Sequence, residues 1–281
     1  MRAKNIWVIG GDGRQAALAG LLAEEGHSVH TCAVGENDGG LEELYRADCV
    51  ILPLPAEGEQ GMVNTPLSGV RLPLAEVVER MRPGQLLCAG MGKPGLAELA
   101  KGRGVVLRDY FAREELAVLN AIPTAEGAIR IAMEELPVTL HGARVLVVGF
   151  GRIGQALTLR LKGLGARVTA AARRPEQRAL ARSMGVCDEG VEGMAEWLCA
   201  YDLVINTVPA PVLGREELAA LKKGAPVIDL ASLPGGVDFA AAEELGVRTV
   251  HALSLPGKTA PVSAGRYIMD TVYHIMEELG V

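Results

Sequence analysis

The chain has 281 residues, of which 49% are hydrophobic. That is enough for one large domain or two ordinary ones, and it excludes a disordered or collagen-like chain. The 28 basic and 34 acidic residues give a net charge of −6, whereas a protein that follows a nucleic-acid duplex is normally basic, so nucleic acid is not an expected partner.

Two other features exclude further classes of protein. The five cysteines form no CxxC pair, which argues against a zinc ribbon or a disulfide framework and favours a reducing cytoplasm. The sequence has no run of about 18 uncharged apolar residues, and its amino terminus runs directly into a predicted strand and turn instead of a signal peptide. We therefore expect no membrane association, and the absence of metal-ligand spacing predicts no metal site.

The first part of the chain alternates predicted strands and helices. Predicted strands lie at 4–10, 27–33, 47–54, 85–90 and 104–107, and predicted helices at 15–25, 74–81 and 96–101. Alternation of this kind implies parallel strands joined by right-handed crossovers. Residues 1–118 are therefore predicted to form a Rossmann-like domain for substrate or dimer contacts.

Two helical stretches, 114–120 and 124–136, follow this domain. We predict a break at Ile122-Pro123, because proline disfavours helix for the residue before it, and a new helix start at Thr124. Residues 119–137 are interpreted as an interdomain helix.

The strand and helix pattern then restarts. Predicted strands lie at 143–148, 167–172, 203–207, 226–229 and 248–251, and predicted helices at 154–164, 175–184, 216–221 and 240–245. Residues 138–262 are predicted to form a second Rossmann domain. The last helix, 263–281, has apolar residues at three- and four-residue steps and is expected to pack back on the first domain or on another copy of the chain. The predicted fold is α/β, with two Rossmann-like parallel-sheet domains joined by long helices.

The strongest motif lies at the start of the second domain. Gly149-Phe-Gly151-Arg152-Ile153-Gly154 is a GxGxxG sequence between a predicted strand and a predicted helix. In such loops the first glycine makes the turn, the second lets the backbone approach a pyrophosphate, and the third allows close packing of helix on strand. Arg152 and Ile153 supply backbone at the helix start, so this loop predicts a dinucleotide site.

The end of the next strand indicates which dinucleotide binds. NAD enzymes usually place Asp or Glu there, but this sequence has Arg173-Arg174. Guanidinium groups suit an adenosine 2′-phosphate, so NADP is predicted over NAD. The alternative is that both arginines are solvated surface charges.

A similar loop in the first domain departs from this pattern. At 10–15 the third glycine position holds Gln15, and Asp12 within the turn would repel a pyrophosphate. Arg14 is a candidate to bind an anionic substrate, and Asp12 beside it is included among the candidate substrate-binding residues. The alternative is an ion pair between Arg14 and Asp12. Lys93 follows another strand at the same sheet edge, without the spacing of a P-loop.

Three further loops carry candidate residues. Thr207, Val208 and Pro209 follow one strand of the second domain and Ser232 follows the next, and both loops are predicted to contact the cofactor. Ordinary turn chemistry is the alternative. Lys258 lies in a loop with several turn residues and is a candidate to neutralise a substrate carboxylate or assist a proton transfer, unless it is an ordinary surface lysine.

Six segments, in order along the whole chain, together carry a family resemblance. They lie at 10–15, 120–128, 149–154, 206–209, 229–236 and 255–261. With these motifs the sequence resembles the family of the dipicolinate synthase A subunit of spore-forming bacteria. It is also similar, more widely, to two-domain dehydrogenases of D-2-hydroxyacids, alanine and adenosylhomocysteine, but lacks the Arg–Glu–His set of the hydroxyacid enzymes.

The resemblance implies oxidation of dihydrodipicolinate, or of the hydroxylated tetrahydro precursor that dehydrates to it, with NADP in the mother cell during sporulation. It also implies a flavoprotein partner, the B subunit of the synthase. A dicarboxylate substrate needs cations, and the candidates are Arg14, Lys93, Lys258 and Arg266; Glu126 or Lys258 is the candidate proton acceptor. Two alternatives stay open: a dehydrogenase of a 2-hydroxy or 2-amino acid, and a non-catalytic cofactor-binding subunit.

Overall fold

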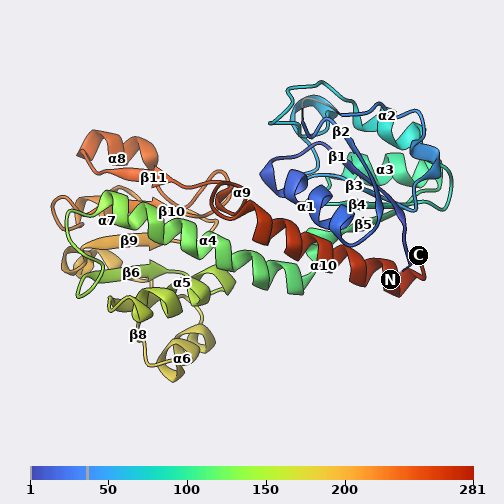
Figure 1. Cartoon of the computed structure of the whole chain (residues 1–281). Helices are drawn as coiled ribbons and strands as arrows, with labels where there is room; N and C mark the ends of the chain where they lie inside the picture. Colours follow the sequence, from blue (N-terminus) through green and yellow to red (C-terminus); the bar gives the residue numbers. More distant parts are fainter. Residues whose placement is uncertain (1, 36–37) are drawn as a thin grey trace. The chain divides into compact units, whose positions relative to one another are not determined.

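The computed structural model describes residues 2–35 and 38–281, and the chain divides into two units (Figure 1). Unit 1 comprises Met1–Asn120 and Pro256–Val281, and unit 2 comprises Ala121–Leu255. The second boundary therefore lies at 255, not at the predicted 262. Lys258, predicted from the sequence to lie in the cofactor domain, belongs to unit 1.

Unit 1 contains a five-stranded parallel sheet in the order β2-β1-β3-β4-β5. Its strands are β1 (Asn5–Ile9), β2 (Ser28–Cys32), β3 (Cys49–Ile51), β4 (Leu86–Ala89) and β5 (Val106–Asp109). The helices that alternate with them are α1 (Gly13–Glu24), α2 (Leu74–Glu79) and α3 (Pro94–Arg103), with 3-10 turns at Leu44–Arg46, Glu59–Gly61 and Tyr110–Ala112. The strand order reverses between β1 and β3, which is where doubly wound sheets bind ligands beyond the carboxyl ends of their strands.

Unit 2 contains a six-stranded parallel sheet in the order β11-β10-β9-β6-β7-β8. Its strands are β6 (Arg144–Val148), β7 (Arg167–Ala171), β8 (Cys187–Glu189), β9 (Leu203–Asn206), β10 (Val227–Asp229) and β11 (Thr249–His251). Its helices include α5 (Arg152–Gly163), α6 (Pro175–Ser183), α7 (Arg215–Ala219) and α8 (Phe239–Leu245), with 3-10 turns at Met194–Glu196 and Leu198–Ala200. This is the strand order of dinucleotide-binding domains, with its reversal between β6 and β9, so the predicted fold class is confirmed.

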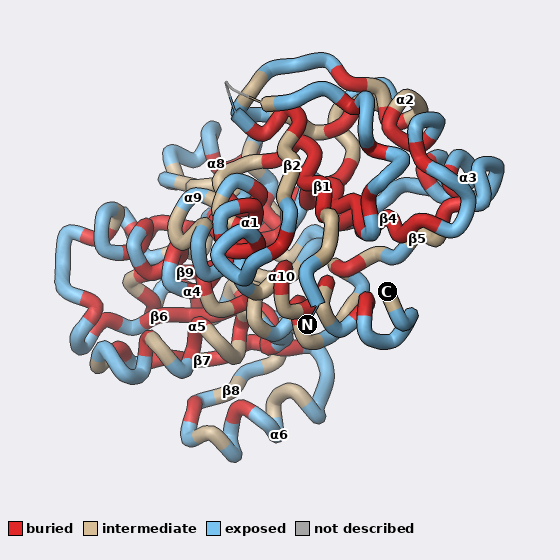
Figure 2. The backbone as a smooth tube through the Cα atoms, turned by 45° about the vertical axis from the view of Figure 1, so that its right-hand side comes forward, coloured by how far each residue is buried: buried red, intermediate tan, exposed pale blue. Residues whose placement is uncertain are grey.

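The central strand β6 shows how the core of unit 2 forms. Residues 145–148 are all fully buried (Figure 2), as expected for a parallel strand covered on both faces. Val145 and Val147 lie in one core cluster with α5, whereas Leu146 and Val148 lie in another with α7 and α8. The edge strand β8 is not predicted from the sequence, because its three residues, Cys-Asp-Glu, form no apolar run.

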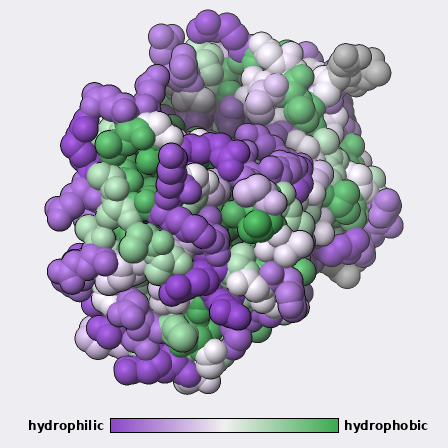
Figure 3. Space-filling view, turned by 90° about the vertical axis from the view of Figure 1, so that its left-hand side faces the viewer, coloured by the Kyte–Doolittle hydropathy of each residue, from purple (hydrophilic) through white to green (hydrophobic). Residues whose placement is uncertain are grey.

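The surface is more hydrophilic than this core. On the face shown in Figure 3, hydrophilic residues surround smaller hydrophobic patches.

The helix α4 (Glu114–Glu135) is continuous, so the predicted break at Ile122-Pro123 is wrong. Proline removes one helical hydrogen bond and strains the preceding turn. Pro123 is nevertheless buried, and Ala125, Ala128 and Ala132, which follow it, are fully buried in the unit 2 core, so packing outweighs the local preference. The length and hydropathy of α4 also meet the requirement for a membrane span, but 56% of that window is buried within the protein, as in a core helix.

The chain ends with α9 (Leu255–Thr259) and the long helix α10 (Pro261–Leu279). The segment that forms α9 is expected from the sequence to be a loop. Helix α10 packs on α1 at Gly265, where a Cβ atom would lie 2.8 Å from the carbonyl oxygen of Arg14. Ile268, Val272 and Ile275 then join the core of unit 1.

His27 links α10 to the amino-terminal strand, and its surroundings in the folded protein disfavour the charged imidazole. Its Nδ1 accepts from the Lys4 backbone N–H at 3.1 Å, and its Nε2 lies 2.9 Å from the Tyr273 hydroxyl. Burial is the largest cause that lowers the pKa of His27 below its usual value of 6.5. The charge of Glu25 opposes this effect, and the charge of Lys4 adds a smaller lowering. The folded state therefore favours neutral imidazole, and the stabilisation is lost as the pH falls below about 6.5.

We expect the stability of unit 1 to decrease between about pH 7 and pH 5, and His27→Gln, which keeps a donor and an acceptor without titrating, to reduce that decrease. Urea unfolding across this range measures the effect. His30→Gln is the matched control, because His30 is a second histidine of the same unit. It lies three residues further along the chain, on β2, where it stacks on Trp7. An equal decrease in wild type and His27→Gln would contradict the assignment.

Candidate functional site

A groove of about 590 Å³ lies at the carboxyl edge of the unit 2 sheet. It is formed by the loop between β6 and α5, by the end of β7, and by the loop after β9. The lining residues are Gly149, Phe150, Gly151, Arg152, Ile153, Ala171, Ala172, Arg173, Arg174, Gln177, Val191, Thr207, Val208, Pro209, Ala210, Pro211 and Val212. The structure thus brings together most of the predicted cofactor residues.

The three glycines of the loop have different roles in the structure. Gly149 has φ +94°, and a Cβ atom there would lie 2.4 Å from the Thr207 hydroxyl oxygen. A Cβ atom at Gly154 would lie 2.2 Å from the carbonyl oxygen of Gly149. At Gly151, by contrast, a Cβ atom would meet nothing within 4 Å. The protein itself therefore requires Gly149 and Gly154, whereas the space at Gly151 is open to a ligand.

The start of α5 fits a phosphate group. Its N-cap residue is Gly151, so the helix start has no capping side chain. The first N–H groups of a helix have no acceptor within the helix and carry partial positive charge. A pyrophosphate at this position would satisfy those donors.

The charged residues of the groove are all basic. Among the described residues that line it, three are arginines, Arg152, Arg173 and Arg174, and none has a carboxylate. Arg173 and Arg174 are exposed directly after the buried Ala172. The Nε of Arg174 lies 3.6 Å from a Glu176 carboxylate oxygen, and both side chains are more than 60% exposed. An exposed pair of this kind contributes about 0–1 kcal/mol and does not prevent the arginine from binding a phosphate.

Ser232 does not lie in this groove. It is exposed, and its carbonyl oxygen accepts from the Gly235 N–H at 2.8 Å in the turn after β10. Ser232 therefore closes a turn outside this groove, and its predicted contact with the cofactor stays a prediction. Thr207, Val208 and Pro209, from the loop after β9, do line the groove.

Arg14 and Asp12 form an ion pair at the start of α1. Arg14 Nε donates to Asp12 Oδ1 at 2.9 Å, Arg14 Nη2 donates to Asp12 Oδ2 at 2.8 Å, and Nη2 also donates to the Leu54 carbonyl. Arg14 is 5% exposed. Burial raises the pKa of Asp12, but the hydrogen bonds and charge of Arg14 outweigh burial and hold that pKa below its usual value. The prediction that Arg14 is free for a substrate is therefore wrong, and its alternative, the ion pair, is what the structure contains.

This first loop also differs from the GxGxxG loop in its available space. Asp12 is the N-cap of α1 and accepts from the Arg14 N–H, so the first turn already has an anion. The Gln15 side chain lies over Gly11, where a Cβ atom would be 2.5 Å from Gln15 Oε1. Unit 1 therefore has neither the free donors nor the space for a pyrophosphate at this turn.

Other predicted cations lie on unit 1. Helix α9 approaches the same loop, because a Cβ atom at Gly257 would lie 2.5 Å from Asp12 Oδ2; Lys258 follows Gly257 directly. Lys93, after β4, lies 3.8 Å from a Glu57 carboxylate oxygen and is 62% exposed. Arg266 is exposed on α10. The loop that holds Asp12 and Arg14 is therefore directly adjacent to α9, the helix that carries Lys258.

Glu126 lies outside the cofactor groove. It is on α4, where its carboxylate pairs with Arg160 Nε of α5 at 3.4 Å and is 52% exposed. Arg160 is eight residues beyond the start of α5, a rise of about 12 Å along the helix. The prediction of a catalytic role for Glu126 is therefore corrected, because its position and ion pair are those of a surface residue.

Two buried residues, Asn206 and Asp229, are missing from the site residues predicted from the sequence. Both end adjacent strands, β9 and β10, and both are fully buried. A polar residue that ends a buried apolar strand is the signal that identifies them. His251, which follows on β11, is half-buried, stacks on Phe239 and hydrogen-bonds the Ala231 carbonyl.

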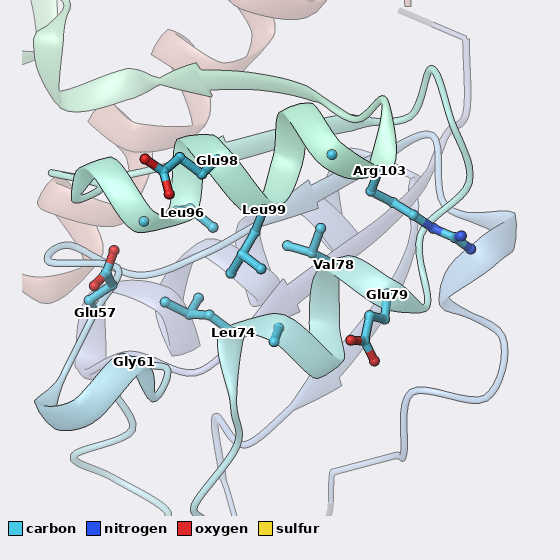
Figure 4. A pocket seen from close by; sticks show the side chains of 12 residues that line it. Glu57, Gly61, Leu74, Val78, Glu79, Leu96, Glu98, Leu99 and Arg103 are labelled. Carbon is cyan, nitrogen blue, oxygen red and sulfur yellow. The ribbon is translucent and has the colours of Figure 1, made fainter.

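Another groove, of about 640 Å³, lies in unit 1 between α2 and α3 (Figure 4). Leu74, Val78, Leu96 and Leu99 point into it, with Glu79, Glu98 and Arg103 at its rim. It is mainly apolar and holds none of the predicted site residues. Within residues 2–35 and 38–281, no three metal-ligating side chains gather at one place, and the five cysteines are free thiols.

Comparison with known proteins gives the same division of the chain. Residues 5–111 match the family model described as the N-terminal domain of the dipicolinate synthase A subunit. Residues 123–233 match the model of the D-isomer specific 2-hydroxyacid dehydrogenase NAD binding domain. The groove therefore belongs to a nicotinamide dinucleotide-binding domain.

Individual relatives match over the whole chain. The dipicolinate synthase A subunit of Bacillus subtilis (strain 168) is 30% identical over 285 residues, covering 98% of this chain and 96% of the relative. The crystal structure of the dipicolinate synthase A subunit from Bacillus halodurans has a TM-score of 0.88 at 31% identity and covers 97% of each chain. An L-alanine dehydrogenase, at 16% identity, shares the fold alone, with a TM-score of 0.65 over 97% of this chain and 90% of its own. The chain thus belongs to the family of the dipicolinate synthase A subunit.

Proposed function

We propose that this chain oxidises dihydrodipicolinate, or the hydroxylated tetrahydro precursor that dehydrates to it, to dipicolinate with hydride transfer to NADP. We place this activity in the cytoplasm of the mother cell during sporulation. Membership of the family supports the reaction, and the groove at the carboxyl edge of the unit 2 sheet supports the cofactor.

The lining of the groove carries the choice of NADP. Enzymes that prefer NAD usually hold the adenosine ribose with a carboxylate after the second strand. Here that position has Arg173 and Arg174, and no carboxylate lines the groove among the described residues. Guanidinium groups bind a phosphate through charge-assisted hydrogen bonds. The pair therefore favours the 2′-phosphate of NADP.

The substrate chemistry sets what unit 1 must provide. Removing two hydrogens from dihydrodipicolinate transfers one as hydride to the nicotinamide ring and releases one as a proton, and aromatisation drives the step. The protein has to hold two carboxylates, align a ring C–H and accept the proton. Lys258 is the cation we assign to a substrate carboxylate or to the proton, with Lys93 and Arg266 as further carboxylate partners. Arg14 neutralises Asp12, which keeps the loop beside Lys258 free of net negative charge.

We also propose that the chain acts with the flavoprotein B subunit of dipicolinate synthase and forms a homo-oligomer. Its relatives are named as the A subunit of a synthase, and such a name supports the existence of a partner chain.

The direct test is to incubate the purified chain with NADP and the products of dihydrodipicolinate synthase. We expect dipicolinate to form together with NADPH, measured by absorbance. NADP binding without NADPH formation, until a flavoprotein is added, would instead identify a non-catalytic cofactor-binding subunit. Oxidation of 2-hydroxy or 2-amino acids at comparable rates would identify a general two-domain dehydrogenase.

We expect Lys258→Ala to bind NADP normally and to lower kcat/KM for the substrate by about ten- to a hundredfold, because a hydrogen bond to a charged group contributes about 1.5–3 kcal/mol. The Lys258 side chain is outside the core clusters of unit 1, so the substitution leaves the fold intact. Lys101→Ala, an exposed lysine near the end of α3, is the control. A Lys258→Ala variant that oxidises substrate at the wild-type rate would show that the lysine is an ordinary surface residue.

A further inference from the structure

Two buried side chains connect the loops after β9 and β10. Asn206 and Asp229 end these neighbouring strands, and neither has any exposed surface. Asn206 Nδ2 donates to Asp229 Oδ1 at 2.8 Å. Neither residue lines the groove, so any effect they have on a ligand is transmitted through the loops they hold.

Asn206 holds the loop that forms one wall of the groove. Its Oδ1 accepts from the Val208 N–H at 3.0 Å, and its Nδ2 donates to the Val208 carbonyl at 3.0 Å. One amide group thereby fixes both backbone groups of Val208. Val208 and the three residues after it line the groove.

Asp229 holds the second loop against the first. Its Oδ1 also accepts from the Ala231 N–H at 3.0 Å, and its Oδ2 accepts from the Gly236 N–H at 2.8 Å. A Cβ atom at Gly236 would lie 2.3 Å from Asn206 Nδ2 and 2.6 Å from the Val208 carbonyl oxygen. The Gly236 carbonyl in turn accepts from the N–H groups of Val212 and Leu213, both at 3.0 Å. The two loops are therefore one hydrogen-bonded body with the Asn206–Asp229 pair at its centre.

The place of this body in the sheet identifies the part of the ligand it affects. In a dinucleotide-binding sheet the ligand crosses the point of strand reversal, here between β6 and β9, and the adenosine end lies over the second strand, here β7. The β9 and β10 side therefore receives the nicotinamide end.

Resting on the proposed function, we propose that Asn206 and Asp229 are positioning residues that set the groove wall 208–211 for the nicotinamide half of the cofactor. The pair makes no contact with the ligand. It acts by fixing Val208 and by locking the loop after β10 against it, so that the wall is formed before the cofactor arrives.

The chemistry of the pair makes the two single exchanges informative. In Asp229→Asn the amide offers one oxygen where the carboxylate offers two acceptors, so its NH2 group faces an N–H donor in either orientation. In Asn206→Asp two buried carboxylates face each other, which is unfavourable. The double variant Asn206→Asp/Asp229→Asn restores a donor facing an acceptor between the two side chains, with the roles exchanged. It leaves a carboxylate oxygen facing the Val208 carbonyl and an amide NH2 group facing the Ala231 N–H. Asp238→Asn is the control for loss of one charge, because Asp238 is the exposed N-cap of α8 and asparagine caps a helix equally well.

Calorimetric titration with NADP and with adenosine 2′,5′-bisphosphate, which lacks the nicotinamide half, tests the proposal. We expect each single variant to weaken NADP binding by about tenfold or more and to leave bisphosphate binding within about twofold of wild type. The double variant should recover only part of the NADP affinity, because the side-chain pair is restored whereas the bonds to the Val208 carbonyl and the Ala231 N–H are not. Asp238→Asn should match wild type.

Two results would overturn the proposal. These are wild-type NADP binding in both single variants, and equal losses for NADP and the bisphosphate. If a single variant does not fold, the double variant is judged by the same comparison of NADP binding with bisphosphate binding. Wild-type protein that binds neither compound removes the proposed function and this inference together, whereas wild-type protein that binds both leaves the proposed function standing whatever the variants do.

Discussion

Replacing Gly151 with alanine is expected to weaken NADP binding by about 30- to 1,000-fold, or about 2–4 kcal/mol, while the protein keeps its fold. A Cβ atom at this position meets no protein atom within 4 Å. The backbone has φ −81° and ψ −161°, a conformation that alanine adopts without strain. The added methyl group therefore occupies only the space that a pyrophosphate needs at the start of α5. Calorimetry with NADP measures the loss, and thermal unfolding measures the fold.

The neighbouring glycines provide the comparison. Gly163→Ala, at the other end of α5, also meets nothing within 4 Å. It is expected to leave the affinity unchanged and to raise stability slightly, because alanine favours a helix more than glycine does. Gly154→Ala places a Cβ atom 2.2 Å from the Gly149 carbonyl oxygen, so it is expected to disturb the loop and lower stability as well as affinity. If Gly151→Ala binds NADP as wild type does, the phosphate does not approach the backbone at this loop.

The sequence predicts the cofactor half well because its signals are local. The spacing of Gly149, Gly151 and Gly154 fixes a turn whose geometry depends mainly on the loop itself, although Thr207 also limits the space at Gly149. The first strand of unit 2 is a continuous apolar run, and burial on both sides of the sheet follows from it. These predictions need no knowledge of distant residues.

Predictions that depend on distant residues succeed less often. Proline at 123 disfavours helix locally, but the buried alanines that follow it pack in the core and α4 continues. Glu126 resembles a proton acceptor in a family motif, yet its place on α4 opposite Arg160 follows only from how α4 packs on α5.

Polar residues near a sheet edge show the same limit. Arg14 is a plausible substrate cation by sequence, and only the structure reveals that its guanidinium is used by Asp12 and the Leu54 carbonyl, 40 residues away. Asn206 and Asp229 lie 23 residues apart and meet because their strands are neighbours. The order of strands in the sheet, which a single sequence does not specify, determines both contacts.

Removing the arginine pair after β7 is expected to change the preference between the two nicotinamide dinucleotides. Arg173→Ala and Arg174→Ala should each weaken NADP binding by about tenfold, and the double variant by about a hundredfold, because each charge-assisted bond to a phosphate contributes about 1.5–3 kcal/mol, reduced here by solvent exposure. The affinity for NAD, which lacks the 2′-phosphate, should change by less than about threefold. The ratio of the two dissociation constants is the quantity to measure.

Arg167→Ala is the control for this pair, because Arg167 is also an exposed arginine and lies at the opposite end of the same strand, β7. It removes the same charge from the unit without touching the groove. Equal losses for NAD and NADP in the double variant would place the arginines near the pyrophosphate and not the 2′-phosphate. Wild-type protein with the same affinity for both dinucleotides would remove the case for NADP.

If the arginines do bind the 2′-phosphate, raising the ionic strength should weaken NADP binding more than NAD binding, because salt screens exposed charges. This difference between the two dinucleotides should disappear in the double variant.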